Sequence, residues 1–319
     1  MKRTSYISTT VLPMKIVINA EACWAAMSHR LYPYHVRVMP TNRCNMRCPE
    51  CTYQNMDRKL SIPYKTLLST TEKLVALGMR AVTITGGGEP LCYPHTQNYI
   101  NYLCDAGIGV GMVTNGLGLR EAHRPTIDSL EWCRISQGDH VPFYPENFTF
   151  LGGYSRVKFG FSYLVGRNIK ADNLCAVLRF AEENGFTHVR VVDSVVDDKK
   201  EELCSRVEPL ISGRAGYGLV VYQPTNHPRP GTGKCLISLL RPVLGPDGCL
   251  YPCCGCVYAR KNPDYKMTSE FKMGDDIDAI YHKQQYFNGA ECARCFEGDA
   301  NDFLNALWDN DRIANRHHL

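Results

Sequence analysis

The sequence predicts an α/β protein: a partial (β/α)6 barrel of the TIM type, followed by a small cysteine-rich C-terminal domain. Short apolar runs rich in β-branched residues alternate with helix-like stretches up to about residue 225. A segment rich in proline and glycine, Pro224 to Gly233, then ends this alternation. Closely spaced cysteines follow with little regular pattern, which predicts a separate small domain.

The elements of the barrel are expected in strict strand–helix order. Strands are predicted at His35–Pro40, Ala81–Thr85, Gly109–Thr114, Trp132–Ser136, Val157–Leu164 and Val189–Asp193. Helices are predicted at Tyr64–Leu77, His95–Ala106, Asn173–Asn184 and Lys199–Ile211. Six strands rather than the eight of a closed barrel leave the barrel open. The expected domains are an N-terminal extension (1–33), the barrel (34–225) and the cysteine-rich domain (226–319).

The composition is that of a folded globular protein, with 44% hydrophobic and 21% charged residues in 319. A net charge of +4 and the lack of a basic block give no support to nucleic acid as the main partner, and none is expected. No apolar run reaches the roughly 18 to 20 residues of a membrane span. Pro13 and Lys15 interrupt the apolar run near the N-terminus, so no signal peptide is expected. These features predict a cytoplasmic protein without a membrane partner.

Sixteen cysteines are more than packing requires. A disulfide framework needs an oxidising compartment, and the sequence shows no export signal. Cysteines at ligand spacings are then better explained by binding of a metal or a cluster. Such spacings occur in two places.

The first group is Cys44, Cys48 and Cys51, which directly follow the first predicted strand. In an α/β barrel this position is the ligand-binding edge. Three thiolates hold three irons of a cubane and leave the fourth iron open. A structural site would close all four positions, as structural zinc does. In a chain with so many cysteines this spacing could arise by chance. Its position directly after a strand favours a [4Fe–4S] cluster with an open iron.

The second predicted strand ends in a glycine run, Thr85-Gly86-Gly87-Gly88-Glu89-Pro90. Glycine lets the backbone approach a ligand closely, and the carboxylate of Glu89 is a suitable acceptor for an ammonium group. Taken alone, this run is more simply a tight turn with a surface glutamate. Its place one strand–helix unit after the cysteine loop favours a binding loop.

Together the cysteine loop and the glycine run resemble the radical S-adenosylmethionine (SAM) superfamily. The resemblance implies that Cys44, Cys48 and Cys51 hold the cluster, whose open iron chelates SAM. It also implies that the SAM amino group is bound by Gly87, Gly88 and Glu89. Further SAM contacts are expected at the ends of later strands, at Asn115, Ser136 and Asn168, with Ser136 near the ribose. The family usually has an aromatic residue before the third cysteine, whereas this chain has Glu50, and Tyr53 is the aromatic alternative.

The second group of cysteines lies in the C-terminal region, at Cys235, Cys249, Cys253, Cys254, Cys256, Cys292 and Cys295. Four thiolates from separated segments can close around one cubane. A hairpin with an Asp247-Gly248 turn is expected to hold Cys235 and Cys253 near each other. The same four thiolates would satisfy a zinc site with four cysteine ligands.

This second pattern resembles the twitch domain, a shortened SPASM extension of some radical SAM enzymes. It implies one auxiliary [4Fe–4S] cluster with four ligands, Cys235, Cys253, Cys292 and Cys295. Cys249, Cys254 and Cys256 are then packing residues, exchanged ligands or hydrogen-atom donors to a substrate radical.

The resemblance implies reductive cleavage of SAM to a 5′-deoxyadenosyl radical that abstracts hydrogen from a substrate. An electron donor such as flavodoxin or ferredoxin is implied as a partner. Length and twitch spacing resemble the small radical SAM dehydrogenases of aminocyclitol antibiotic pathways. A sugar- or cyclitol-like small molecule and net oxidation through the auxiliary cluster are therefore expected. The short segment before the first strand also disfavours a leader-binding domain.

Three alternatives within the family remain: a peptide-modifying maturase, an epimerase and a decarboxylase. A fourth alternative from a different class is a non-catalytic zinc-binding protein. That alternative gives no reason for the glycine run and Glu89 at a strand end.

Overall fold

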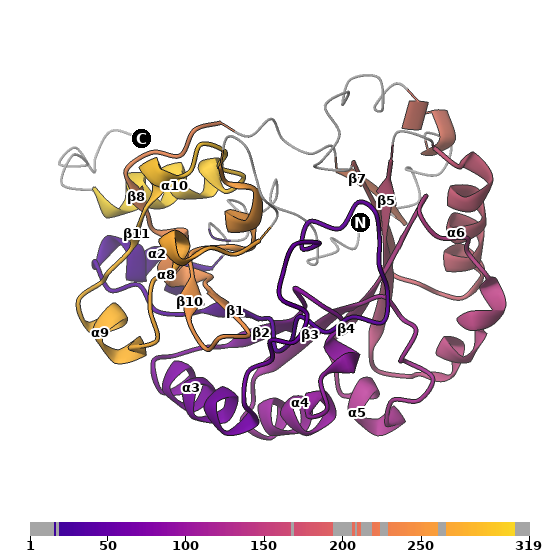
Figure 1. Cartoon of the computed structure of the whole chain (residues 1–319), viewed down its shortest axis with the longest axis horizontal. Coiled ribbons are helices and arrows are strands. Elements are labelled where there is room, and N and C mark those ends of the chain that lie inside the picture. Colours follow the sequence, from indigo (N-terminus) through magenta and orange to yellow (C-terminus); the bar gives the residue numbers. More distant parts are fainter. Residues whose placement is uncertain are drawn as a thin grey trace. The chain divides into compact units, whose positions relative to one another are not determined.

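The computed structural model describes residues 16, 19–166, 169–193, 206–207, 209–211, 219–223, 229–260 and 266–309. Figure 1 shows their helices and strands. The described residues divide into two compact units. The first contains residues 39–61 and 82–223, and the second contains residues 16–38, 62–81 and 229–309.

The sheet of the first unit confirms the predicted α/β class. Its strands are neighbours in chain order: β2 (Ala81–Ile84), β3 (Gly109–Thr114), β4 (Trp132–Gly138), β5 (Lys158–Val165), β6 (His188–Asp193) and β7 (Val220–Gln223). Strands β3 to β7 pair in parallel. Parallel neighbours need crossover connections, and helices α4 (Thr96–Asp105), α5 (Arg124–Asp128) and α6 (Ala171–Glu183) lie in them. The short helix α5 and strand β7 were not predicted.

Short 3₁₀ turns complete the connections of the first unit, at η2 (Pro90–Cys92), η3 (Pro145–Asn147) and η4 (Thr149–Gly153). The helix predicted at Lys199–Ile211 lies mostly outside the described residues. None of the helices in the described ranges is long and apolar enough to cross a membrane.

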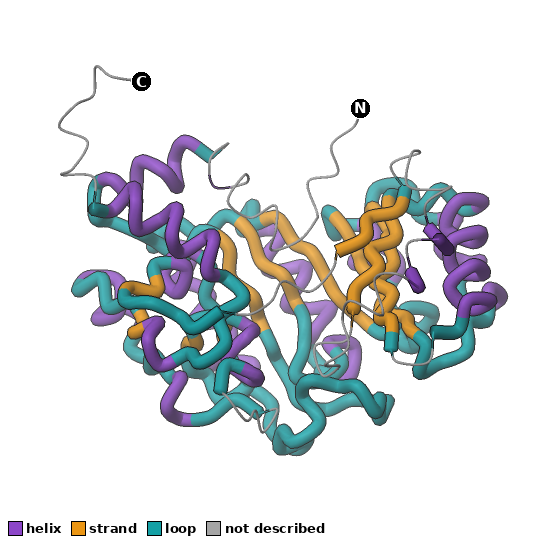
Figure 2. Tube along the Cα trace, turned by 90° about the horizontal axis from the view of Figure 1, so that it is seen from above, coloured by secondary structure: helices purple, strands orange, loops and turns teal. Residues whose placement is uncertain are grey.

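One face of strands β4 to β6 carries an aromatic core. Phe161 on β5 is fully buried, and its ring stacks on Phe186 at a centroid distance of 4.6 Å. Phe143 and Phe180 meet the Phe161 ring edge-on. Phe180 belongs to α6, which Figures 1 and 2 show lying along this side of the strands. The buried residues of α6 recur at helical spacing, so the helix covers the sheet through one apolar face.

The second unit contains two groups of paired strands. Strand β1 (His35–Val38) pairs in parallel with β9 (Val243–Leu244), which pairs antiparallel with β10 (Leu250–Tyr251). Strand β8 (Lys234–Cys235) pairs with β11 (Phe287–Asn288). The remaining elements are α2 (Ala20–Met27), α3 (Tyr64–Ala76), α8 (Ile237–Leu240), α9 (Ile277–His282), α10 (Gly298–Trp308), η6 (Cys254–Tyr258), η7 (Ser269–Phe271) and η8 (Gly289–Glu291).

The β9–β10 pair confirms the predicted hairpin, with Gly248 at φ +81° in its turn. Only glycine adopts such a φ without strain. Cys235 and Cys253 line one cavity, as expected. Cys235 is carried there by β8, where it pairs with Phe287, and not by the hairpin. A two-residue strand has no periodicity from which its partner could be inferred.

Helix α2 packs against α10 within the second unit, although no sequence pattern predicted a helix there. The His29 ring stacks on the Trp308 indole at 4.5 Å, and its Nε2 lies 2.6 Å from the Trp308 carbonyl oxygen. Helix α2 is short and has no strong apolar periodicity. The contact between His29, just after the helix, and Trp308 therefore contributes to its stability.

We expect Phe161→Ala to lower the free energy of unfolding by about 3–5 kcal/mol, because it opens a cavity among four rings. Urea unfolding would measure the change. Tyr144→Ala is the control, since that ring is 52% exposed and its removal should cost less than about 0.5 kcal/mol. Equal destabilisation by the two variants would contradict the proposed core.

Candidate functional site

The loop after β1 brings backbone donors to the first cysteine group. The Met46 N–H donates to Cys44 Sγ at 3.4 Å, and the Tyr53 N–H donates to Cys51 Sγ at 3.4 Å. The Cys51 N–H donates to the Cys48 carbonyl at 3.2 Å, which makes a tight turn between these two residues. Donors aimed at sulfur stabilise thiolates, the form that binds a cluster.

The three thiols of this loop are close enough to influence one another. Burial raises the pKa of Cys48 to about 11, and the neighbouring Cys51 and Cys44 contribute to that rise. Burial also raises the pKa of Cys51. The Arg58 guanidinium opposes both shifts, and its Nη1 donates to the Met46 carbonyl at 3.1 Å. Iron would oppose the same shifts more strongly, so the group fits a cationic cluster.

The glycine run packs against the backbone just before this loop. The Gly88 N–H donates to the Thr41 carbonyl at 3.0 Å, and the Glu89 N–H donates to the Arg43 carbonyl at 2.7 Å. A Cβ on Gly88 would lie 2.1 Å from the Arg43 carbonyl oxygen, and one on Gly87 would lie 2.3 Å from Asn42 Oδ1. The glycines are therefore needed for a close approach of two backbone segments.

Glu89 is buried at the centre of this arrangement, with 3% of its surface exposed. Its Oε1 accepts from the Thr114 hydroxyl at 2.6 Å and from the Leu91 N–H at 3.1 Å. Its Oε2 accepts from the Asn115 N–H at 2.7 Å. Burial raises the pKa of this carboxyl, and the three donors oppose the shift. The side chain thus ties the glycine run to the end of β3, and its contact with the SAM amino group stays a prediction.

Asn115 links the end of β3 to the cysteine loop. Its Nδ2 donates to Asn45 Oδ1 at 2.7 Å, between Cys44 and Cys48 in the sequence. The structure therefore brings the cysteine loop, the glycine run and Asn115 together in one unit. Glu50 lies elsewhere, against Gly166 after β5, where a Cβ would meet its Oε1 at 2.3 Å.

Ser136 lies on a polar face of the sheet, which we define by Arg134, Ser136, Ser162 and Arg190. This face is opposite to the aromatic core, because alternate residues of β4 and β5 are fully buried. Ser136 is in register with Ser162, and Ser162 with Arg190. Arg190 Nη1 donates to Ser162 Oγ at 3.2 Å. The predicted ligand Asn168 lies outside the described residues.

The second cysteine group surrounds a cavity in the second unit. Cys235, Cys253, Cys292 and Cys295 all line it, and each is at least half-buried. Burial raises the pKa of Cys235 to about 12 and that of Cys292 to about 12, and neighbouring thiols contribute to both shifts. Across the described ranges, no three His, Cys, Asp or Glu side chains have the geometry to bind one metal ion. The convergence of four thiols on one cavity nevertheless fits a four-ligand cluster.

The remaining cysteines of this region do not line the cavity. The Cys254 sulfur instead accepts a hydrogen bond from Arg37 Nη1, and Cys256 is buried in the turn η6. Cys249 follows the hairpin turn beside Asp247. This arrangement favours Cys253 over Cys254 as the ligand.

Several residues of these sites gave no signal in the sequence. Arg58 donates to the Met46 carbonyl within the cysteine loop, and Asn45 accepts from Asn115. Asn301 donates to Cys235 from a distant part of the chain, and no local pattern encodes these contacts. Helix α10, which carries Asn301, could have been found from the helical spacing of Ala300, Leu304 and Trp308.

We expect Gly88→Ala to prevent binding of the first cluster, since the added Cβ would displace the backbone before Cys44. After anaerobic reconstitution, iron per chain should fall by about four relative to the wild type. Gly152→Ala is the control, because a Cβ there meets nothing within 4 Å. Full iron content in Gly88→Ala would show that the close approach is not required.

His188 should make the stability depend on pH. Burial, then Arg134 and Arg190, lower its pKa to about 3. Because the folded-state pKa is below the unfolded value, the free energy of unfolding should fall as the pH drops from about 6.5 towards 3, by up to about 1.4 kcal/mol per unit. His188→Phe should reduce this slope in urea unfolding measured at pH 7.5 and pH 5. An unchanged slope in His188→Phe would contradict this origin.

The comparisons with known proteins agree with this geometry. Residues 38–135 match the model of the Radical SAM superfamily. GTP 3′,8-cyclase of Ectopseudomonas mendocina (strain ymp) is 26% identical over 201 residues, which cover 54% of this chain and 60% of the cyclase. The subtilosin biosynthesis protein AlbA of Bacillus subtilis (strain 168) is 28% identical over 90 residues, 28% of this chain and 20% of AlbA.

The fold is shared with Streptococcus suis SuiB, solved with its precursor peptide SuiA. The TM-score is 0.59 at 14% identity, and the match covers 84% of this chain and 70% of SuiB. The chain thus spans 60% or less of the two curated relatives. The matched segment, residues 38–135, contains both the cysteine loop and the glycine run. This segment is similar to the Radical SAM superfamily, whose enzymes use a [4Fe–4S] cluster and SAM.

Proposed function

We propose that this chain is a radical SAM oxidoreductase that abstracts hydrogen from a sugar- or cyclitol-like small molecule, with an auxiliary [4Fe–4S] cluster as electron relay. The observation that carries the second cluster is the cavity lined by Cys235, Cys253, Cys292 and Cys295. Four thiolates close a cubane, so this cluster would transfer electrons rather than bind substrate. We also propose a cytoplasmic location, where thiols stay reduced.

Cys44, Cys48 and Cys51 would hold a cluster that, with one electron from a donor such as flavodoxin or ferredoxin, would supply cleavage of SAM to methionine and a hydrogen-abstracting 5′-deoxyadenosyl radical. Cys235, Cys253, Cys292 and Cys295 would hold the auxiliary cluster, which would supply an acceptor for the electron left on the substrate radical when that radical loses a proton. The residues of the chain hold and orient these groups. The glycine run keeps the cysteine loop in place through its contact with Thr41 and Arg43. SAM would lie along Gly87, Gly88 and Glu89, with Asn115, Ser136 and Asn168 as further contacts.

The polar face supports a small, polar substrate. Arg134 and Arg190 offer guanidinium donors, and Ser136 and Ser162 offer hydroxyls on adjacent strands. Such groups hydrogen-bond hydroxyl-bearing or anionic molecules. Side chains on rigid strands also fix the orientation of a substrate, which selects the hydrogen to be abstracted.

A peptide substrate is the second candidate. It is favoured by similarity to AlbA, named for bacteriocin biosynthesis, and to SuiB, solved with its precursor peptide. The polar face does not discriminate against an extended peptide, whose backbone also offers hydrogen-bonding groups.

Removal of each cysteine group should have separable effects. We expect about eight irons per reconstituted wild-type chain, and about four after replacing either Cys44, Cys48 and Cys51 or the four cavity cysteines by Ala. Only the first replacement should abolish 5′-deoxyadenosine formation from SAM and dithionite. Cys104→Ala is the control, since its sulfur contacts Ser129 at 3.6 Å and no ligand group.

Metal analysis of the wild type provides the contradicting outcomes. A wild-type chain with about four irons and one zinc would show that the second cysteine group binds zinc and not an auxiliary cluster. A chain without iron that forms no 5′-deoxyadenosine would contradict the enzyme altogether. Turnover of a cyclitol in D₂O separates the reactions, because oxidation incorporates no solvent deuterium and epimerisation does.

A further inference from the structure

The first turns of helix α10 face the four-cysteine cavity. Glu297, Gly298 and Asn301 line it together with the thiols. Asn301 is 6% exposed, and its Nδ2 donates to Cys235 Sγ at 3.5 Å. Asn301 is therefore a cavity-lining residue whose side-chain amide contacts one of the four thiols.

The orientation of the Asn301 amide follows from its second contact. Its Oδ1 accepts from the Ile237 N–H at 2.9 Å. Because a backbone N–H only donates, the amide atom facing Ile237 must be the oxygen. The amide nitrogen therefore faces the Cys235 sulfur and donates to it.

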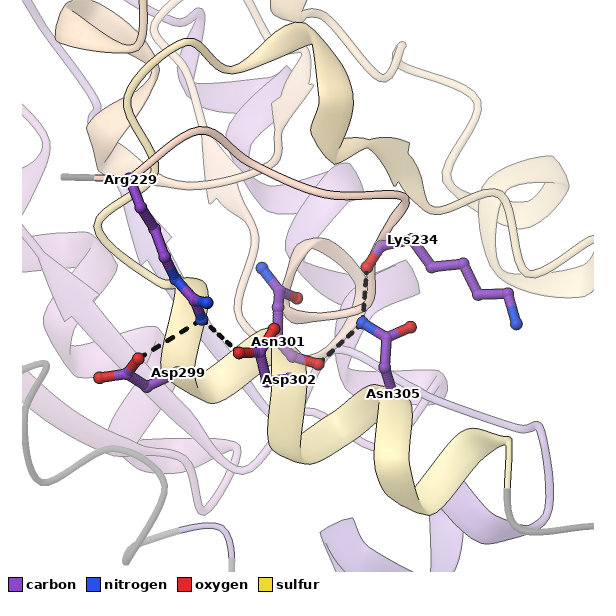
Figure 3. Close-up of polar contacts among 6 residues, drawn as sticks. All are labelled: Arg229, Lys234, Asp299, Asn301, Asp302 and Asn305. Atoms are coloured by element: carbon purple, nitrogen blue, oxygen red, sulfur yellow. Dashed lines mark hydrogen bonds and ion pairs between the residues drawn. The ribbon is translucent and has the colours of Figure 1, made fainter. Parts of the chain in front are cut away.

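Helix α10, which carries Asn301, is joined to the segment before Cys235 by contacts to Arg229 and Lys234, as Figure 3 shows. Asn305 Nδ2 donates to the Lys234 carbonyl at 3.0 Å and to the Asn301 carbonyl at 2.8 Å. Arg229 pairs with Asp299 at 3.4 Å and with Asp302. Asn305 lies one helical turn after Asn301, and its amide donates to carbonyls, whereas the Asn301 amide donates to Cys235.

We propose that Asn301 raises the reduction potential of the auxiliary cluster. A hydrogen bond to a cysteine sulfur stabilises the additional negative charge of the reduced cluster more than that of the oxidised cluster. Asn301 thus favours acceptance of an electron from the substrate. The inference rests on the proposed four-cysteine cluster, and it assigns Asn301 as a positioning residue that acts through Cys235.

Two pairs of variants isolate the donor. Asn301→Asp keeps an acceptor for the Ile237 N–H and removes the donor, and Asn301→Leu removes both groups. Asn305→Asp and Asn305→Leu are matched controls, because Asn305 lies on the same helix and donates to carbonyls, not to sulfur. All four are made in the full chain with Cys44, Cys48 and Cys51 replaced by Ala, so that only the auxiliary cluster remains. Its midpoint potential is measured by a redox titration followed by electron paramagnetic resonance.

We expect each Asn301 variant to lower the equilibrium constant for reduction of the auxiliary cluster about tenfold. This corresponds to a fall of about 59 mV in its one-electron potential. The Asn305 variants should shift by less than half of that value. Asn301 variants that hold four irons at the potential of their Asn305 counterparts would overturn the role of Asn301. No iron in the parent of all four variants would instead refute the auxiliary cluster.

A second measurement tests the contact between Asn301 and Cys235 in the parent protein, so it holds even if the Asn301 variants do not bind the cluster. Parent protein labelled with ¹⁵N in asparagine side chains should show a nitrogen hyperfine coupling to the reduced cluster. A cluster that forms without such a coupling would overturn the contact between Asn301 and Cys235.

Discussion

The close approach of two backbone segments, Asn42–Arg43 and the glycine run, is the constraint on which the first site depends. Two hydrogen bonds join the glycine run to the backbone before Cys44, and the space between them has no room for a Cβ at Gly88. Glu89 then anchors the same run to β3 through buried donors. The cysteine loop is therefore positioned by the sheet rather than by its own short turns, which are too few to define a cluster site alone.

The second site is organised by a helix. Helix α10 contacts the β8 segment through side-chain amides and brings Asn301 to the sulfur of Cys235. Arg241 and Glu297 form a buried ion pair at the start of this helix, beside the cavity. Removal of one partner would leave an uncompensated buried charge. Polar contacts of this kind hold the thiols in position where the two-residue strands β8 and β11 provide little regular structure.

The sequence predicted those features that repeat or are spaced at short range. The strands from β2 to β6 follow from β-branched apolar runs, and both cysteine groups follow from ligand spacing. Helix α2 and the β8–β11 pair could not be predicted, because tertiary contacts such as His29 on Trp308 hold them. The donors to Glu89 and the role of Asn301 depend on residues far apart in the chain, so no local pattern encodes them.

The two cysteine groups differ in how much chain each one closes. Cys44 and Cys51 lie within one short loop, whereas Cys235 and Cys295 enclose the β9–β10 hairpin, α9 and β11. Closing a longer loop removes more entropy from the unfolded chain, although the increase is slow. If each group holds a cluster, insertion would therefore be coupled more strongly to folding of the unit around Cys235. During synthesis, the first group of cysteines is complete early, and the second is complete only once Cys295 has been added.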